Sequence, residues 1–285
     1  MLTPLFRTLC LPVTLHSAWK LVKSKNSAGG IDGLSIVQFE ENLAENLADL
    51  RQELIHKTWN PEPYLRVEIP KKETEIRRLG LLSIRDKIVQ QAIKTLIEPK
   101  MEKLFLNNSY GYRPGKGPAR AIRRVMYIYN QVKRGWVAKL DIDDYFDTIK
   151  QEQLFISLQN LLKDEEIVRL IELCLKTGVV TKQLKWSETG KGLPQGAVLS
   201  PLLANFYLHP FDQFVVNKIP NYVRYADDFL VISGNREELE TTVRDIEAIL
   251  ESKFSLKLNT PVITDLETGT EFLGIWIKRS GLTLT

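Results

Sequence analysis

The sequence predicts an α+β protein with a split βαβ motif in its second half. The chain has 285 residues, 44% of them hydrophobic, so it is long enough to bury a sizeable core. Helical spacing dominates residues 1–135. Residues 136–285 instead indicate strand, helix, hairpin, helix and strand, which is the order of a split βαβ motif. We therefore expect two domains with these bounds and some interleaving between them.

The first half is expected to begin with helices and then a strand. Ser35 can cap a helix whose apolar residues recur at steps of three and four from Ile36 to Leu54. Residues 64–70 alternate apolar and polar side chains, which is typical of a half-buried strand.

Two further helices are expected in the first half. Ser83 and Asp86 resemble a capping box at the start of a helix that should run until Pro99. A glycine-containing loop over 111–117 then leads to Pro118, which suits the first position of the next helix.

Apolar runs and turn signals place the elements of the second half. Helical spacing covers 152–176 and recurs between Leu239 and Leu250. Strands are expected at 136–142, on both sides of a tight turn within 222–233, and at 254–258 and 272–277.

A net charge of +4 conceals two halves of opposite charge. Residues 1–139 carry 24 Lys and Arg side chains against 13 Asp and Glu, and residues 140–285 carry 15 against 22. A basic front half suggests a polyanionic partner. The acidic back half is either an ordinary solvated surface or a source of carboxylates for a metal cation.

Composition excludes several classes of protein. Two cysteines are too few for a disulfide scaffold, and three widely spaced histidines argue against a histidine-rich metal centre. No apolar run approaches the roughly 20 residues that a membrane span needs. We expect a cytoplasmic protein that does not enter a membrane.

Three acids stand where a sheet presents carboxylates. Asp141 ends an apolar strand, and Asp227 and Asp228 lie in the expected hairpin turn. A turn alone explains a pair of aspartates, because Asp favours turns. Acids that meet from separate strands would instead repel one another unless a divalent cation neutralises them. Mg²⁺ prefers such oxygen ligands, and two Mg²⁺ ions about 4 Å apart catalyse phosphoryl transfer.

Five ordered blocks around these acids carry a family resemblance. The sequence resembles reverse transcriptases of the group II intron-like bacterial lineage from residue 30 to residue 274. The blocks are IPKKETEIRRLGLLSIRDKIVQQAI (69–93), SYGYRPGKGPARAI (109–122), KLDIDDYFDTI (139–149), GLPQGAVLSPLLANFYL (192–208) and YADD (225–228).

The resemblance implies a right-hand polymerase with fingers in 1–135 and a palm in 136–285. The palm would be a ferredoxin-like antiparallel sheet with helices on one face. Asp141, Asp227 and Asp228 would be its catalytic aspartates. Asp141 and Asp227 would provide most of the metal ligation, assisted by the Ile142 carbonyl, with Asp228 as the less direct ligand. The cofactor would be two Mg²⁺ ions, for which Mn²⁺ is expected to substitute.

The resemblance also assigns a nucleotide-binding set. Lys71 and Arg77 match fingers residues that hold the incoming triphosphate, where cations offset phosphate charge. Phe146 matches an aromatic gate that fills the space of a nucleotide 2′-hydroxyl. Gln195 and Gly196 match a segment beside the nascent base pair. For each residue the alternative is an ordinary surface, loop or core position.

Three arginines are candidates for template contact. Arg85, Arg113 and Arg120 would bind template phosphates, which position a strand without reading its sequence. A solvated helix face is the alternative for them.

The chain departs from the family in three places. Val262 lies where the family usually has a lysine that protonates departing pyrophosphate, and Ala197 replaces a common glycine. The chain ends at Thr285, where a helical thumb would follow. We expect the thumb to be missing or truncated, or a partner protein or fused domain to supply thumb or integrase function.

The resemblance implies an RNA-directed DNA polymerase that uses an RNA template, a DNA or RNA primer and dNTPs. The expected setting is domesticated, such as CRISPR spacer acquisition or phage defence. Three alternatives stay open: a non-enzymatic RNA-binding splicing or maturase-type factor, a fragment of an intron-mobility reverse transcriptase, and an RNA polymerase or terminal transferase on the same palm.

Overall fold

The structure is a computed structural model with two compact units. It describes the chain from residue 3 to residue 284, apart from 27, 73–74, 133, 182–184 and 188–189, and the side chains from 71 to 77 are not described. The first unit comprises residues 1–100 and 150–200, and the second comprises 101–149 and 201–285. The compact units thus interleave more than a division at residue 135 implies, and the functional domains stay a prediction.

The first unit begins with four helices. Ser35 caps the third, and it forms the full capping box with Gln38. The single helix expected from Ile36 to Leu54 is wrong, because Asn42 leaves the helical region at φ −120° and ψ 39° and breaks it in two. The helices are α1 (Pro4–Leu9), α2 (Pro12–Ser24), α3 (Ile36–Glu41) and α4 (Leu43–His56).

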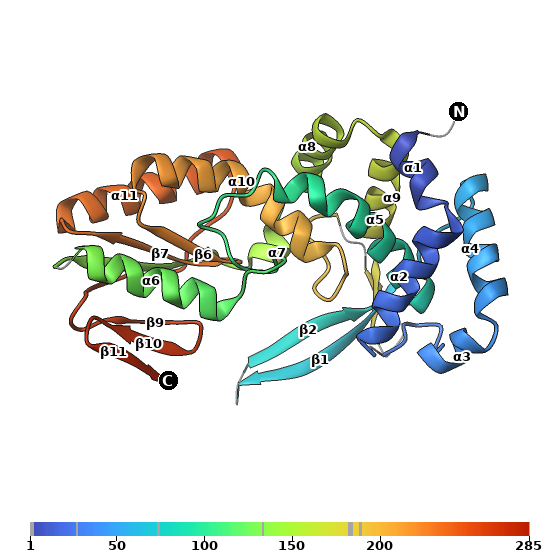
Figure 1. Ribbon diagram of the computed structural model, residues 1–285, viewed down its shortest axis with the longest axis horizontal. Helices are drawn as coiled ribbons and strands as arrows, with labels where there is room; N and C mark the ends of the chain where they lie inside the picture. The colour runs from blue at the N-terminus through green and yellow to red at the C-terminus, as the bar shows by residue number, and fades with distance from the viewer. Residues whose placement is uncertain are drawn as a thin grey trace. The chain divides into compact units, whose positions relative to one another are not determined.

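A four-stranded sheet follows in the first unit, with the order β2-β1-β4-β5. The expected strand at 64–70 is confirmed as the start of a long hairpin between β1 and β2 (Figure 1). Strand β4 joins β1 in parallel, and β5 joins β4 antiparallel. The strands are β1 (Tyr64–Lys72), β2 (Glu75–Leu81), β4 (Val179–Thr181) and β5 (Trp186–Ser187).

Helix α5 spans Ile84–Glu102, so the expectation that this helix ends at Pro99 is wrong. Proline removes one helical hydrogen bond, which costs about 3 kcal/mol. Ile97 and Met101 are fully buried on either side of it, and their burial offsets that cost. Helices α8 (Gln151–Leu162) and α9 (Glu165–Lys176) complete this unit.

The second unit contains the expected split βαβ sheet. Its strand order is β6-β7-β3-β8, and every neighbouring pair is antiparallel. Between β3 and the hairpin the chain contributes residues 150–200 to the first unit before it forms α10, and α11 lies between the hairpin and β8. The elements are β3 (Trp136–Asp141), α10 (Ser200–Lys218), β6 (Tyr222–Tyr225), β7 (Asp228–Ser233), α11 (Arg236–Ile249) and β8 (Val262–Asp265).

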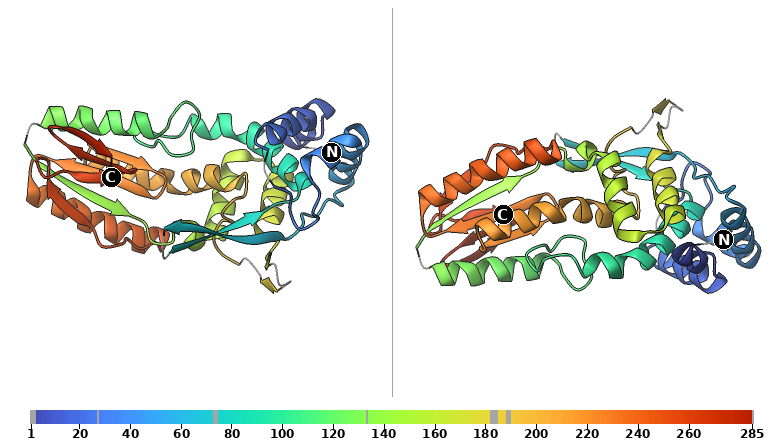
Figure 2. Two further views of the ribbon diagram at one scale, coloured as in Figure 1. Left: turned by 90° about the horizontal axis from the view of Figure 1, so that it is seen from below. Right: turned by 90° about the horizontal axis from the view of Figure 1, so that it is seen from above.

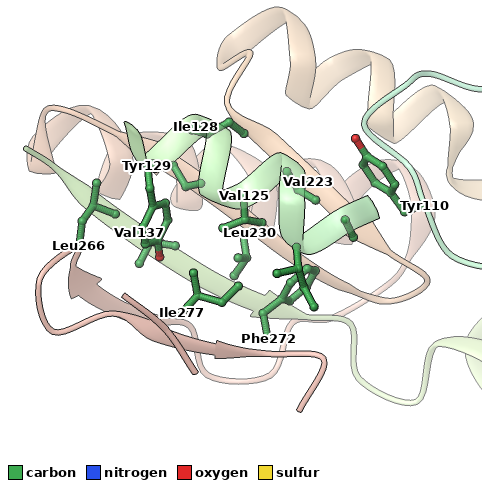
Figure 3. Packing of buried hydrophobic residues seen from close by; sticks show 13 residues of the cluster. Tyr110, Val125, Ile128, Tyr129, Val137, Val223, Leu230, Leu266, Phe272 and Ile277 are labelled. Carbon is green, nitrogen blue, oxygen red and sulfur yellow. The ribbon is translucent and has the colours of Figure 1, made fainter. Parts of the chain in front are cut away.

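The sheet of the second unit is covered on both faces. The two helices inside the motif, α10 and α11, lie on one face as expected, where Phe211 of α10 packs on Tyr222 and Phe229. Helix α6 (Pro118–Val132) lies on the opposite face (Figures 1 and 2). Buried side chains of α6, β3, β6 and β7 meet there with Phe272 and Ile277 (Figure 3).

Two strands expected near the C-terminus are misplaced. The strand expected at 254–258 is wrong, because residues 250–254 form a π-helical turn. Within 254–258 only Leu258 makes a bridge, which is an isolated one to Ile142, and the strand of this region is β8. Positive φ angles at Leu273 and Gly274 split the strand expected at 272–277. The result is a three-stranded sheet of β9 (Thr270–Phe272), β10 (Ile275–Lys278) and β11 (Gly281–Leu284).

Among the described residues, no helix is both long enough and apolar enough to cross a membrane.

Candidate active site

The expected acids meet at one end of the sheet in the second unit. Asp141 is the last residue of β3 and lies directly opposite Asp228, the first residue of β7. Asp227 lies in the turn between β6 and β7, and its carbonyl accepts a hydrogen bond from the Ile142 amide at 3.3 Å. The prediction that carboxylates from separate strands come together is therefore confirmed for this pair of strands.

The turn before Asp227 has a constrained backbone. Ala226 adopts a φ of +60°, which is uncommon for a residue with a Cβ atom. Gly111 lies against it so closely that a Cβ on Gly111 would be 2.5 Å from the Ala226 nitrogen. The backbone at Gly111 therefore packs directly against the turn, and only glycine at this position permits so close an approach.

Asp228 carries an unsatisfied acceptor. Its Oδ1 atom is shielded from solvent and has no hydrogen-bond partner among the described residues. Burial raises the pKa of this carboxyl to about 7, with Lys139 opposing the shift and the negative charges of Asp141 and Asp227 adding to it. An orphaned carboxylate oxygen beside a second acid is what a bound cation would satisfy.

Asn259 is a contact of Asp141 that sequence reasoning missed. Its Nδ2 donates to Asp141 Oδ2 at 2.7 Å, and its backbone amide donates to the Asp141 carbonyl at 2.9 Å. The Asp143 amide in turn donates to the Lys257 carbonyl at 2.9 Å. The only available signal was the Leu-x-Leu-Asn segment that ends in Asn259, because no local pattern links it to a strand 118 residues earlier.

The donor set fits a divalent metal. Carboxylate and carbonyl oxygens suit hard cations. Within the part of the chain that the structure describes, no group of three or more Asp, Glu, His or Cys side chains is arranged to hold a metal ion. Mg²⁺ is usually held by one or two carboxylates together with substrate phosphates and water.

Phe146 belongs to an aromatic group in the second unit. It follows Asp141 through α7 (Tyr145–Thr148), and its ring meets Tyr112 edge-on, with the ring centroids 6.3 Å apart. The ring centroids of Tyr112 and Tyr225 are 6.4 Å apart. The Tyr145 hydroxyl donates to the Ala204 carbonyl at 2.6 Å, which anchors the start of this short helix. Tyr112 was missed because its contact depends on the loop at 111–117.

The nucleotide-binding candidates of the first unit lie on two adjoining segments. The Gly80 amide donates to the Gln195 carbonyl at 2.7 Å. Gly196 has a φ of +101°, and a Cβ there would lie 2.6 Å from the Gly80 carbonyl oxygen. Arg77 lies three residues before Gly80 on β2, so the structure brings these segments together.

Lys71 lies on β1, where the hairpin register shifts between Pro70 and Lys72. The side chains of Lys71 and Arg77 lie outside the described residues, so their expected contact with a triphosphate stays a prediction.

The three candidate template arginines differ in environment. Arg85 forms an ion pair with Glu53 and is half-buried, whereas Arg120 is exposed near the start of α6. Arg113 is buried: its guanidinium binds the Glu102 carboxylate, and its Nη1 donates to the Ser109 carbonyl at 2.8 Å. The expectation that Arg113 contacts a template is not supported by this placement, because its donors already hold its own loop.

Val262 is half exposed on β8 and lies directly opposite Lys139 of β3. The Lys139 ammonium donates to Glu271 Oε2 at 2.7 Å. Lys139 thus lies beside Val262, where the family usually has a lysine, and its ammonium is paired with Glu271.

Comparison with known proteins gives consistent similarities. The sequence model of the family described as reverse transcriptase (RNA-dependent DNA polymerase) matches residues 69–277. Protein YkfC of Escherichia coli K12 is 30% identical over 95% of this chain and 81% of its own length. The group II intron-encoded protein LtrA of Lactococcus lactis subsp. cremoris is 27% identical, over 98% of this chain and 57% of its own. The chain thus spans little more than half of LtrA.

Two solved structures share the fold. Apo telomerase from Candida tropicalis, truncated from its C-terminal domain, has a TM-score of 0.62 at 14% identity, over 83% of this chain and 59% of its own. A partial Cas6-RT-Cas1–Cas2 complex has a TM-score of 0.53 at 22% identity, over 88% of this chain and 43% of its own.

Proposed function

Because the chain belongs to the reverse transcriptase family, a family of divalent-metal-dependent RNA-directed DNA polymerases, we propose that it extends a primer 3′ end with dNTPs on an RNA template. One observation supports this most directly: Asp141 and Asp228 face each other at a sheet end beside the constrained turn of Asp227. A protein that only binds RNA has no need of a self-repelling acidic pair at such a turn.

We assign the metal ligands to this sheet end. Asp141, Asp227 and the Ile142 carbonyl would hold two Mg²⁺ ions, for which Mn²⁺ would substitute, and Asp228 would assist through its unsatisfied oxygen. When bound, the ions activate the attacking primer oxygen and offset charge on the phosphates. The protein's part is to keep these oxygens fixed before substrate arrives, as Asn259 does for Asp141.

The remaining assignments concern substrate. Phe146 would exclude a 2′-hydroxyl by filling its space, and Lys71 and Arg77 would bind the triphosphate. Gln195 and Gly196 would lie along the nascent pair, where the backbone of Gly196 permits close approach.

Template contact is assigned to Arg85 and Arg120. The exposed Arg120 is the better placed of the two, since Arg85 would first leave Glu53. Both contacts would be to phosphates, so binding should weaken with salt and depend little on template sequence.

The biological setting is proposed from the relatives. A domesticated role in CRISPR spacer acquisition or another defence system is suggested by the Cas6-RT-Cas1–Cas2 complex, in which a reverse transcriptase is assembled with Cas proteins. A partner or fused domain would then contribute the integrase function. LtrA is encoded by a group II intron, and this favours an intron setting as the second candidate.

Primer extension on an RNA template with dNTPs and Mg²⁺ tests the activity. The wild-type chain should extend the primer, and Asp227→Asn should lower the rate at least about 100-fold, because the variant lacks a carboxylate that would hold the metal ions that offset charge on the phosphates. Asp245→Asn is the matched control, because it changes a surface acid of α11 that is paired with Lys218 of α10. Equal extension by wild type and Asp227→Asn would contradict the assignment.

A further inference from the structure

A buried ion pair lies behind the turn that carries Asp227. Arg224 of β6 is 1% exposed and Asp212 of α10 is fully buried. They form a bidentate pair: Arg224 Nε donates to Asp212 Oδ1 at 2.7 Å, and Nη2 donates to Oδ2 at 2.5 Å. The Tyr222 hydroxyl donates to the same Oδ1 at 2.7 Å. Apolar side chains of similar volume commonly give equal or greater stability, so stability alone is a weak reason for this pair.

The third nitrogen of Arg224 is directed to the turn itself. Arg224 Nη1 donates to the Ala226 carbonyl at 2.8 Å and to Asn205 Oδ1 at 3.0 Å. Ala226 is the residue with the positive φ, and its carbonyl belongs to the peptide unit that leads into Asp227. Because a peptide unit is planar, a fixed Ala226 carbonyl also fixes the direction in which Asp227 leaves the turn.

Asn205 and the Arg224 backbone bind the segment on the other side of the turn. Asn205 Nδ2 donates to the Gly111 carbonyl at 2.7 Å, and Gly111 is the glycine packed against the Ala226 nitrogen. The Tyr110 amide donates to the Arg224 carbonyl at 2.8 Å. The Arg224 guanidinium thus links helix α10, strand β6 and the turn, and the Asp212 carboxylate offsets its positive charge.

We propose that Arg224, held in place by Asp212, is a positioning residue that sets the conformation of the Ala226–Asp227 turn and so the placement of the metal-binding carboxylate. A backbone conformation that an L-residue rarely adopts persists only where its surroundings enforce it, and these contacts provide that enforcement. The inference rests on the proposed function, since it gives the turn its role.

Arg224→Lys is the most informative single change. Lysine keeps the charge and pairs with Asp212, but it cannot form the planar fork that binds the carboxylate and the Ala226 carbonyl together. We expect a folded protein whose kcat for primer extension falls about 100-fold, with the KM for dNTP and template–primer nearly unchanged. Tyr222→Phe is the control, because it removes one bond to Asp212 and leaves the contact with the turn; its kcat should stay within about 3-fold of wild type.

A triple variant separates positioning from folding. Asp212→Leu, Tyr222→Phe and Arg224→Met together replace the ion pair by apolar groups, so that neither charge is left buried alone, and they remove the donor to the Ala226 carbonyl and Asn205 Oδ1. We expect it to unfold cooperatively and at no lower temperature than Arg224→Lys, while kcat stays low. A folded triple variant with wild-type kcat would overturn the proposal. Failure of both Arg224 variants to fold would overturn it as well, because the pair would then be required by the fold and not by the turn.

Binding of Mn²⁺, followed by electron paramagnetic resonance without nucleic acid or dNTP, gives a readout that does not depend on turnover. Affinity should fall about 10-fold in Arg224→Lys and stay close to wild type in Tyr222→Phe. Unchanged Mn²⁺ affinity together with unchanged kcat in Arg224→Lys would contradict the inference. A wild-type chain that binds Mn²⁺ in this way but does not polymerise would contradict the proposed function alone.

Discussion

At the scale of single residues, Phe146 has the most direct chemical consequence. If its ring excludes the 2′-hydroxyl, Phe146→Ala should raise incorporation of ribonucleotides relative to deoxyribonucleotides by at least about 10-fold, because the space it occupied becomes available. Tyr112→Ala should produce a smaller rise, since Tyr112 supports the Phe146 ring edge-on. The measurement is the ratio of kcat/KM for each dNTP and the matching NTP.

Tyr127→Ala serves as the control for both changes. Tyr127 is 54% exposed on α6, where it stacks on Arg124. Its loss should leave sugar selectivity as in wild type. Unchanged selectivity in Phe146→Ala would remove the gate from the proposed site, and unchanged selectivity in Tyr112→Ala alone would remove only its supporting role.

Residues near the site also show where sequence reasoning ends. The meeting of Asp141 and Asp228 was predictable, because strand ends and hairpin turns have clear local signals. Asn259 was not, since its contact with Asp141 spans 118 residues and follows no periodicity. The motif around Arg113 predicts template contact, whereas its ion pair with Glu102 depends on how the intervening loop folds.

At the scale of elements, the junction between β2 and the loop at Gly196 makes a sharp prediction. Gly196→Ala should lower the free energy of unfolding by about 1–3 kcal/mol, because alanine is strained at this φ and its Cβ would meet the backbone of Gly80. Displacement of the loop should also raise the KM for dNTP. Denaturant unfolding and primer-extension kinetics measure the two effects.

Gly190→Ala is the matched control for this change. A Cβ at Gly190 meets no heavy atom of the described residues within 4 Å, so the same substitution should be nearly neutral there. If Gly196→Ala were as stable and active as Gly190→Ala, the close approach of Gly196 to β2 would be needed neither for stability nor for activity.

Elements differ in how far the sequence predicts them. Helix positions followed from apolar spacing, and the split βαβ order of the second unit is confirmed. Breaks and continuations did not follow: Asn42 interrupts one helix and α5 runs through Pro99. The continuation of α5 accompanies the burial of Ile97 and Met101, where tertiary packing overrides local propensity. The strand expected at 254–258 failed for the same reason, because burial of Leu250 and Phe254 favours an extra helical turn.

At the scale of the whole molecule, the opposite charges of the two sequence halves do not follow the compact units. The first unit carries 22 Lys and Arg against 18 Asp and Glu, and the second carries 17 of each. The basic segment 101–149 is folded together with the acidic segment 201–285. Within the second unit, therefore, basic α6 and the acidic sheet end belong to one body, as a site for both phosphates and a cation requires.

Stability of the whole chain should depend on pH through Asp86. Burial raises the pKa of its carboxyl to about 7, against hydrogen bonds with Ser83 and the Glu62 amide that lower it. The unfolded chain loses this proton near pH 4, whereas the folded chain keeps it until about pH 7. The folded state therefore binds more protons in that interval, so the contribution of Asp86 to stability falls as pH rises from 4 to 7 and is constant above.

Asp86→Asn should remove this dependence, because asparagine imitates the neutral carboxyl and its Oδ1 still accepts from Glu62. Relative to wild type, the variant should gain up to about 4 kcal/mol of unfolding free energy at pH 8 and little at pH 4. Urea unfolding of both proteins at the two pH values measures the difference. Glu45→Gln, which neutralises a surface acid of α4, is the control and should leave the pH dependence intact. An equal pH dependence in wild type and Asp86→Asn would mean that Asp86 is already ionised in the folded protein at pH 5, with its charge compensated by Arg85 or by the helix N-terminus.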